Sequence, residues 1–130
     1  MLNKSVILIV LAVTMILSTG CGPREVKVTT AENGGQIEVK AGDQFVVELE
    51  GNPSTGYTWE ARDLDTNMFQ QIGDAEFTSG DPGLVGAGGT LALTFKAIQA
   101  GTGTLTLVYH RSWEPDVAPA DTFTVTVIVK

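Results

Sequence analysis

The sequence predicts an all-β fold, an immunoglobulin-like sandwich of two antiparallel sheets. Apolar and polar residues alternate with a period of two through much of the chain after residue 24, as they do in half-buried strands. Gly, Pro, Asp and Asn separate these runs, and no stretch has the clear period of an amphipathic helix. Because strand side chains point alternately to two faces, each run offers an apolar face that a second sheet has to cover.

The strongest alternation occurs in four segments, Asp43–Glu50, Thr90–Gln99, Thr102–His110 and Thr122–Lys130. The apolar faces of these segments are formed by Phe45, Val47 and Leu49; Leu91, Leu93, Phe95 and Ala97; Leu105, Leu107 and Tyr109; and Phe123, Val125, Val127 and Val129. Shorter candidate strands are Glu25–Thr30, Gln36–Lys40, Tyr57–Arg62 and Phe69–Ile72.

Eight short strands favour two sheets packed face to face, with a small barrel as the alternative. The Cys…Trp…Cys framework of antibody domains is absent from the sequence. Loops gather at the two ends of a sandwich and usually carry its function, so the unusual loops are the place to look for a site.

The first 20 residues are predicted to be a signal peptide of the lipoprotein type. Lys4 gives a positive start, Val6 to Leu17 is almost entirely aliphatic, and small residues follow. This apolar run of about a dozen residues is shorter than the roughly 20 that span a bilayer, and an uncleaved N-terminal anchor helix is the alternative.

Cys21 is the single cysteine, so a disulfide within the chain is excluded. Its place after the signal core resembles a bacterial lipobox, in which the cysteine becomes the lipidated first residue, although Ser18 stands where that motif usually has leucine. We therefore expect lipidation at Cys21, a tether over residues 21–24 and a folded domain over residues 25–130. The chain would be exported and lipid-anchored to the cell membrane or cell surface, or alternatively secreted or periplasmic.

The net charge of the chain, −7, argues against a nucleic-acid partner, which requires a basic surface. Loss of Lys4 with the leader would make the mature protein one unit more negative. An acidic domain also has no basic attraction to anionic lipid, so membrane contact would come from the anchor alone.

The first unusual loop is Asn52-Pro53-Ser54-Thr55-Gly56-Tyr57, between two predicted strands. Pro53 fixes its own φ and keeps Asn52 extended, and Gly56 can adopt a positive φ. The small side chains of Ser54 and Thr55 leave the backbone accessible. The same composition is also that of an ordinary turn.

The second loop runs from Asp81 to Gly89 and contains four glycines. It approaches a phosphate-binding loop, but glycine stands where the phosphate-binding lysine should be and a strand follows in place of a helix. A nucleotide site is therefore rejected. Either the loop is a plain hairpin connection or its backbone is shaped for close approach to a partner.

The third loop, Arg111-Ser112-Trp113-Glu114-Pro115, follows the strand that contains Tyr109. Trp and Arg are favoured anchors in binding surfaces, so Trp113 beside Arg111 suggests a contact site. The alternative is that Trp113 folds back onto the core.

Together and in this order, the three loops resemble the chagasin family of cysteine peptidase inhibitors. That family is marked by an Asn-Pro-x-Thr-Gly-aromatic loop, a Gly-x-Gly-Gly loop and an Arg-Pro-Trp-like loop on an immunoglobulin-like β-sandwich. The matching segments are Asn52–Tyr57, Gly86–Gly89 and Arg111–Trp113, and the resemblance covers nearly all of the chain after the leader. In the third loop Ser112 replaces the proline, which removes a stiffening residue but not the anchor.

The resemblance implies a reversible, non-covalent inhibitor of papain-like cysteine peptidases, with the three loops side by side at one end as a wedge for the active-site cleft. Thr55 would come closest to the catalytic cysteine of the peptidase, and the other two loops would hold the sides of the cleft. The residues expected to bind the peptidase are Asn52, Pro53, Ser54, Thr55, Gly56, Tyr57, Gly86, Ala87, Gly88, Gly89, Arg111, Ser112 and Trp113. We expect a monomer without cofactor, metal or catalytic residue.

Other classes of function have weaker support in the sequence. His110 is the single histidine and no nucleophile elbow accompanies it, which argues against an enzyme. Asp63, Asp65 and Asn67 begin like a calcium loop, but Met68 and Asp74 stand where that loop needs glycine and glutamate. The remaining alternative is an immunoglobulin-like surface lipoprotein that binds a carbohydrate or an envelope protein, with tryptophans as stacking platforms.

Overall fold

The computed structural model describes residues 25–80, 83, 86 and 88–130, so the predicted leader, the tether and Cys21 lie outside the described residues. The strands are β1 (Glu25–Val28), β2 (Gln36–Val39), β3 (Gln44–Gly51), β4 (Thr58–Arg62), β5 (Phe69–Ser79), β6 (Gly89–Ala97), β7 (Gly101–His110) and β8 (Asp121–Val129). Two short 3-10 turns, η2 (Thr30–Glu32) and η3 (Pro53–Thr55), complete the elements. No helix in these ranges has the length and apolar character needed to cross a membrane.

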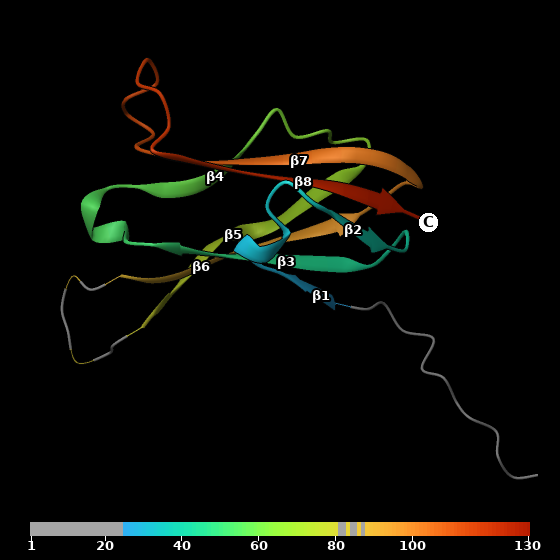
Figure 1. Ribbon diagram of the computed structural model, residues 1–130, viewed down its shortest axis with the longest axis horizontal. Helices are drawn as coiled ribbons and strands as arrows, with labels where there is room; N and C mark the ends of the chain where they lie inside the picture. Colours follow the sequence, from blue (N-terminus) through green and yellow to red (C-terminus); the bar gives the residue numbers. More distant parts are fainter. Residues whose placement is uncertain (1–24, 81–82, 84–85, 87) are drawn as a thin grey trace, which may run out of the picture.

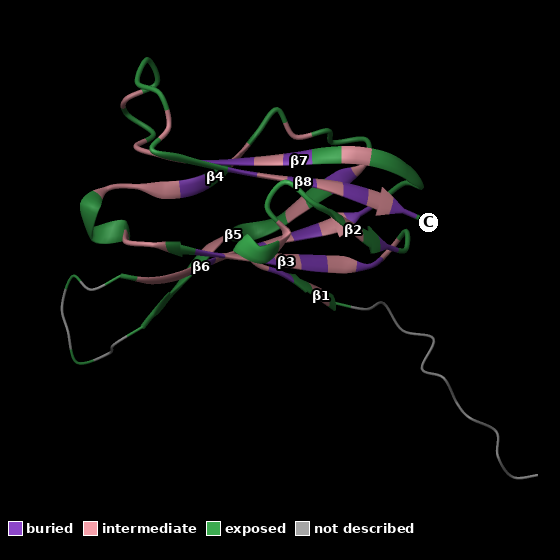
Figure 2. Cartoon of the chain, in the orientation of Figure 1, coloured by how far each residue is buried: buried purple, intermediate pink, exposed green. Residues whose placement is uncertain are grey.

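The strands form two four-stranded sheets in the orders β1-β3-β6-β5 and β2-β8-β7-β4, packed as the two layers of a sandwich (Figure 1). The predicted fold class is therefore confirmed. Both sheets contribute one face to a common core. In this core the Phe45 ring stacks on the Phe95 ring with 5.5 Å between ring centres, and it packs edge to face with the Phe69 ring at a centre distance of 6.0 Å. Figure 2 shows buried residues along the strands and exposed residues in the loops.

The edge strands correct one part of the prediction, because the sheets are not purely antiparallel. β1 pairs with β3 and β2 pairs with β8 in parallel, whereas the other neighbours are antiparallel. After β1 the chain crosses to the second sheet to form β2 and then returns to the first sheet as β3. Because each crossing reverses the chain direction, β3 runs the same way as β1.

The strand β5 is longer than the predicted Phe69–Ile72. It continues to Ser79 through an irregularity between Ile72 and Glu76, where Gly73 has a φ of 70°. Gly73 and Asp74 look like the end of a strand in the sequence, but they form a β-bulge that lets the pairing with β6 resume.

Candidate functional site

The strand registers bring the three unusual loops to one end of the sandwich. Gly51 and Ser79 both pair with Gly89, so the first and second loops leave the same end of one sheet. In the other sheet Thr58 pairs with His110, so the first loop ends where the third loop begins. The loops project together from the end opposite Lys130 (Figure 1), and we call this end the loop end.

The first loop is a capped 3-10 turn, not an irregular segment. Asn52 is extended and its side-chain oxygen accepts a hydrogen bond from the Ser54 N–H at 3.2 Å, while Pro53 occupies the first turn position. Gly56 closes the turn with a φ of 85°, and its N–H donates to the Pro53 carbonyl at 2.9 Å. This geometry leaves Pro53, Ser54 and Thr55 exposed at the tip.

One side of this turn is bonded to the second loop. The Asn52 side-chain amide donates to the Gly86 carbonyl at 3.0 Å, and the Ser54 hydroxyl approaches the same oxygen at 3.4 Å. Gly86 itself has a φ of 77°, which suits glycine. Ala87 lies outside the described residues, and Gly88 and Gly89 lead from the loop into β6.

The other side of the turn is bonded to the third loop. Arg111 donates through Nε to the Thr55 carbonyl at 3.1 Å, and its guanidinium carbon lies 4.5 Å from the centre of the Tyr57 ring. The Trp113 ring lies against Gly56, so close that a Cβ at position 56 would overlap it. Trp113 is nevertheless 65% exposed, so it does not fold back into the core.

Trp59 of β4, Tyr109 of β7 and Tyr57 at the end of the first loop form a continuous stack of aromatic rings. The Tyr109 ring lies 5.1 Å from the Trp59 ring on one side and 5.2 Å from the Tyr57 ring on the other. Arg111 covers the far face of Tyr57, so the stack reaches from the core to the third loop.

The sequence matches the family described as "Chagasin family peptidase inhibitor I42" over residues 38–127. The chain belongs to the chagasin family of peptidase inhibitors. It is 33% identical over 104 residues to amoebiasin-1 of Entamoeba histolytica, covering 78% of this chain and 97% of the relative. It is 32% identical over 104 residues to chagasin of Trypanosoma cruzi, covering 76% and 93% of the two chains.

A solved structure has the same fold. The cysteine protease inhibitor EhICP2 of Entamoeba histolytica matches with a TM-score of 0.70 and 25% identity, over 84% of this chain and all of that chain. Membership of the chagasin family confirms the predicted function as a chagasin-type inhibitor of papain-like cysteine peptidases, and it confirms that the chain is not an enzyme.

The described residues of the three loops offer hydroxyls, backbone groups, the Asn52 amide, the Arg111 guanidinium and one indole. The Nε2 atom of His110 lies 2.9 Å from Oε2 of Glu60, on the outer face of the sheet and outside the three loops. No group of three or more His, Cys, Asp or Glu in the described ranges could hold a metal ion. The calcium-like segment forms a turn, in which the Asp65 carboxylate accepts a hydrogen bond from the Asn67 N–H at 3.0 Å.

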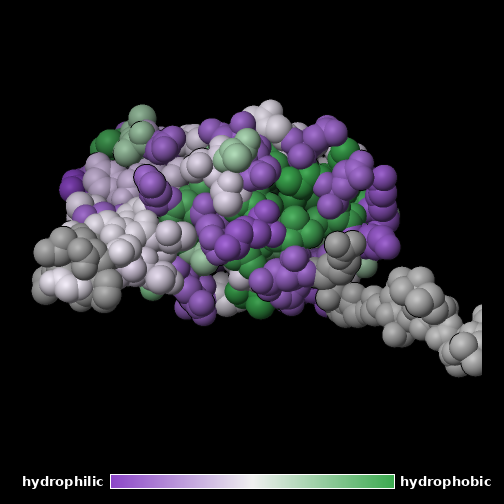
Figure 3. Space-filling view, turned by 60° about the horizontal axis from the view of Figure 1, so that its bottom comes forward, coloured by the Kyte–Doolittle hydropathy of each residue, from purple (hydrophilic) through white to green (hydrophobic). Residues whose placement is uncertain are grey.

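The two tryptophans lie in different environments, which argues against a sugar-binding platform. Trp59 is only 4% exposed, and its indole N–H donates to the Glu50 carbonyl at 2.9 Å. Trp59 therefore supports the loop end from the core, and Trp113 is the exposed indole of the pair. The surface of the loop end is mostly of intermediate hydropathy in the view of Figure 3, whereas strongly hydrophilic and strongly hydrophobic side chains lie side by side over the body of the sandwich.

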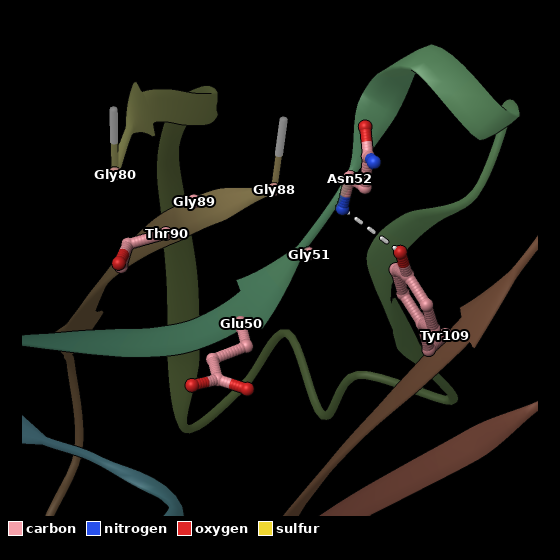
Figure 4. A pocket seen from close by; sticks show the side chains of 8 residues that line it. All are labelled: Glu50, Gly51, Asn52, Gly80, Gly88, Gly89, Thr90 and Tyr109. Carbon is pink, nitrogen blue, oxygen red and sulfur yellow. Dashed lines mark hydrogen bonds between the residues drawn. The ribbon is translucent and has the colours of Figure 1, made fainter. Parts of the chain in front are cut away.

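An open pocket of about 600 Å³ lies between the first and second loops (Figure 4). Its lining consists of Glu50, Gly51, Asn52, Gly80, Gly88, Gly89, Thr90 and Tyr109. Sequence reasoning placed Tyr109 only on the apolar face of its strand and did not assign it to the site. The available signal was its position near the end of its strand, two residues before Arg111 of the third loop.

Proposed function

We propose that the three loops act as a preformed wedge, which occupies the cleft of a papain-like cysteine peptidase reversibly and without covalent reaction. The observation that carries this proposal is the bonding of the first loop on both sides. Asn52 and Ser54 hold it to Gly86 of the second loop, while Arg111 and Trp113 hold it from the third.

Thr55 is the side chain that we place nearest the catalytic cysteine. It is exposed at the tip, and its hydroxyl donates to the Asn52 carbonyl at 2.6 Å. A hydroxyl already engaged within its own turn is poorly placed to react, so the loop fills the site as a rigid body. Such preformed loops lower the ordering cost of association, which lets a contact of modest area become tight.

We further propose that the chain is exported and anchored to a membrane through a lipid on Cys21. The leader-like composition of residues 1–20 and the single cysteine that follows support this proposal. The described domain begins at Glu25, and β1 runs toward the loop end because it is parallel to β3. An anchor on the N-terminal side would therefore hold the domain with the wedge directed away from the membrane.

The test is a titration of the domain from Gly22 onward, without the leader, against papain and a fluorogenic peptide substrate. We expect loss of activity at nanomolar to micromolar inhibitor, recovery of activity on dilution, and an intact inhibitor band afterwards. A folded domain that inhibits neither papain nor any cathepsin-like peptidase would contradict the wedge. Cleavage of the domain in step with a transient inhibition would identify it as a substrate.

A further inference from the structure

We infer that Tyr109 is a positioning residue, which fixes the first loop in its inhibitory geometry from below and does not contact the peptidase. The inference rests on the proposed function and explains how that loop is held. Tyr109 belongs to β7 in one sheet, whereas the first loop grows out of β3 in the other. Tyr109 therefore bonds the start of the loop, at the end of β3, to the sheet that the loop itself enters only later, at β4.

The decisive contact is a hydrogen bond to the first residue of the loop. The Asn52 backbone N–H donates to the Tyr109 hydroxyl at 3.0 Å, between residues 57 positions apart in the chain (Figure 4). Pairing between β3 and β6 ends at Gly51 and Gly89, so Asn52 lies one residue beyond the ladder. Tyr109 thus supplies the partner of this amide where the sheet no longer does.

The neighbouring residues leave Tyr109 little freedom. Its ring is held between Trp59 and Tyr57, with centre distances of 5.1 Å and 5.2 Å. A Cβ at Gly51 would lie 3.6 Å from the Tyr109 ring and would overlap the Leu91 side chain. Leu91 therefore requires the glycine, whereas the ring would only be in ordinary contact with that Cβ. The ring stack limits where the hydroxyl points.

A second bond from the same sheet holds the same stretch of chain. Trp59 donates its indole N–H to the Glu50 carbonyl at 2.9 Å, two residues before Asn52. The peptide groups on both sides of Gly51 are thus bonded to side chains of the opposite sheet. Tyr109 also bonds through its own carbonyl to the Ala120 N–H at 2.8 Å, which closes the base of the third loop.

Loss of the hydroxyl should act on the free inhibitor and leave the surface of the complex unchanged. Without it the turn can leave its bound geometry, and only a fraction of the molecules is competent to bind at any moment. Apparent affinity falls by that fraction, and the fall appears in the association rate when the bound geometry itself is unchanged. A truncated contact residue would instead speed dissociation.

The experiment compares the domain from Gly22 onward, which contains every described strand, with its Tyr109→Phe variant. Phenylalanine keeps the ring stack and removes only the hydroxyl. Stopped-flow association and dissociation rates with papain should show association slowed about five-fold, the equivalent of one hydrogen bond, with dissociation little changed. In the free protein, hydrogen exchange of the Asn52 amide should accelerate.

The matched control is Asn33→Ala, which removes a side-chain acceptor 3.0 Å from the Thr124 N–H, outside the three loops. It should lower the melting temperature without changing either rate constant. The inference would be overturned if Tyr109→Phe and the parent had equal association rates, or if Asn33→Ala slowed association as much as Tyr109→Phe. Unchanged hydrogen exchange of the Asn52 amide in Tyr109→Phe would also overturn it. If the parent itself does not inhibit, the proposed function fails, while exchange at Asn52 still tests whether Tyr109 holds the loop.

Discussion

Trp113 has two roles that its position makes inseparable. Its ring covers Gly56 of the first loop, and 65% of its surface remains open to a partner. An indole ring that is both supported and exposed offers a large contact area at a low cost in conformational entropy. The third loop therefore supplies an anchor even though Ser112 stands in the place of the stiffening proline.

Replacement of Trp113 by alanine should weaken peptidase binding by about 2 kcal/mol, the lower limit for a binding hot spot, which corresponds to roughly 30-fold in Kd. Inhibition constants and thermal melting would be measured together, because the melting temperature should change little. Val117→Ala is the matched control, since Val117 lies in the same connection between β7 and β8, is 57% exposed and is outside the predicted site. Equal inhibition by both variants would remove Trp113 from the binding surface.

Thr55 tests the depth to which the first loop inserts. A Thr55→Lys side chain adds length and charge at an exposed tip residue, so we expect inhibition to be lost while the fold is kept, because desolvating an unpaired ammonium is costly. Thr55→Ser keeps the hydroxyl that bonds to the Asn52 carbonyl and should inhibit nearly as well as the parent. Full inhibition by the lysine variant would mean that the loop stays outside the cleft.

As an element, the first loop depends on Asn52 in two separate ways. The side-chain oxygen of Asn52 caps the 3-10 turn through the Ser54 N–H, while its amide nitrogen bonds to Gly86 of the second loop. One substitution can remove the second contact and keep the first, because aspartate still accepts at the cap but cannot donate to a carbonyl.

Asn52→Asp should therefore melt close to the parent but inhibit less well, whereas Asn52→Ala should lose about 1 kcal/mol of stability as well as affinity. Melting curves and inhibition constants for the two variants separate the cap from the link between loops. If aspartate inhibits as well as asparagine, the bond to Gly86 does not contribute to the wedge.

The sequence predicts most strands because their determinants are local. Phe45, Val47 and Leu49 alternate with polar residues, and the structure buries all three in β3. The direction of the edge strands is not local, because β1 and β2 pair with partners that their own residues do not specify. The segment Asn52 to Tyr57 could be recognised in the sequence because the residues of a motif are contiguous. The role of Tyr109 could not be recognised, because its bond to Asn52 joins segments that are distant in the sequence.

At the scale of the whole molecule, the two described ends lie at the end opposite the loops. Glu25 pairs with Gln44 at the start of β3, and Val129 pairs with Gly101 at the start of β7. The first and last described strands therefore begin and end, respectively, at the end of the sandwich remote from the three loops.

Cys21→Ser should release the protein from the membrane fraction, because the proposed acyl chains have no other attachment site. Fractionation of cells expressing the full chain would show the difference, with immunodetection of both fractions. Inhibition by the released protein should equal that of the parent, since the loops are remote from the anchor. A serine variant that remains in the membrane fraction would favour an uncleaved N-terminal helix.

The parallel pairing of β2 with β8 has a kinetic consequence. It joins Gln36–Val39 to residues 126–129, so the second sheet cannot be completed until residues 126–129 have been synthesised. Contacts this distant in sequence make folding slow, since a long loop must be ordered before any of them forms. If the chain is exported as we propose, this topology would delay completion of the second sheet until residues 126–129 have emerged.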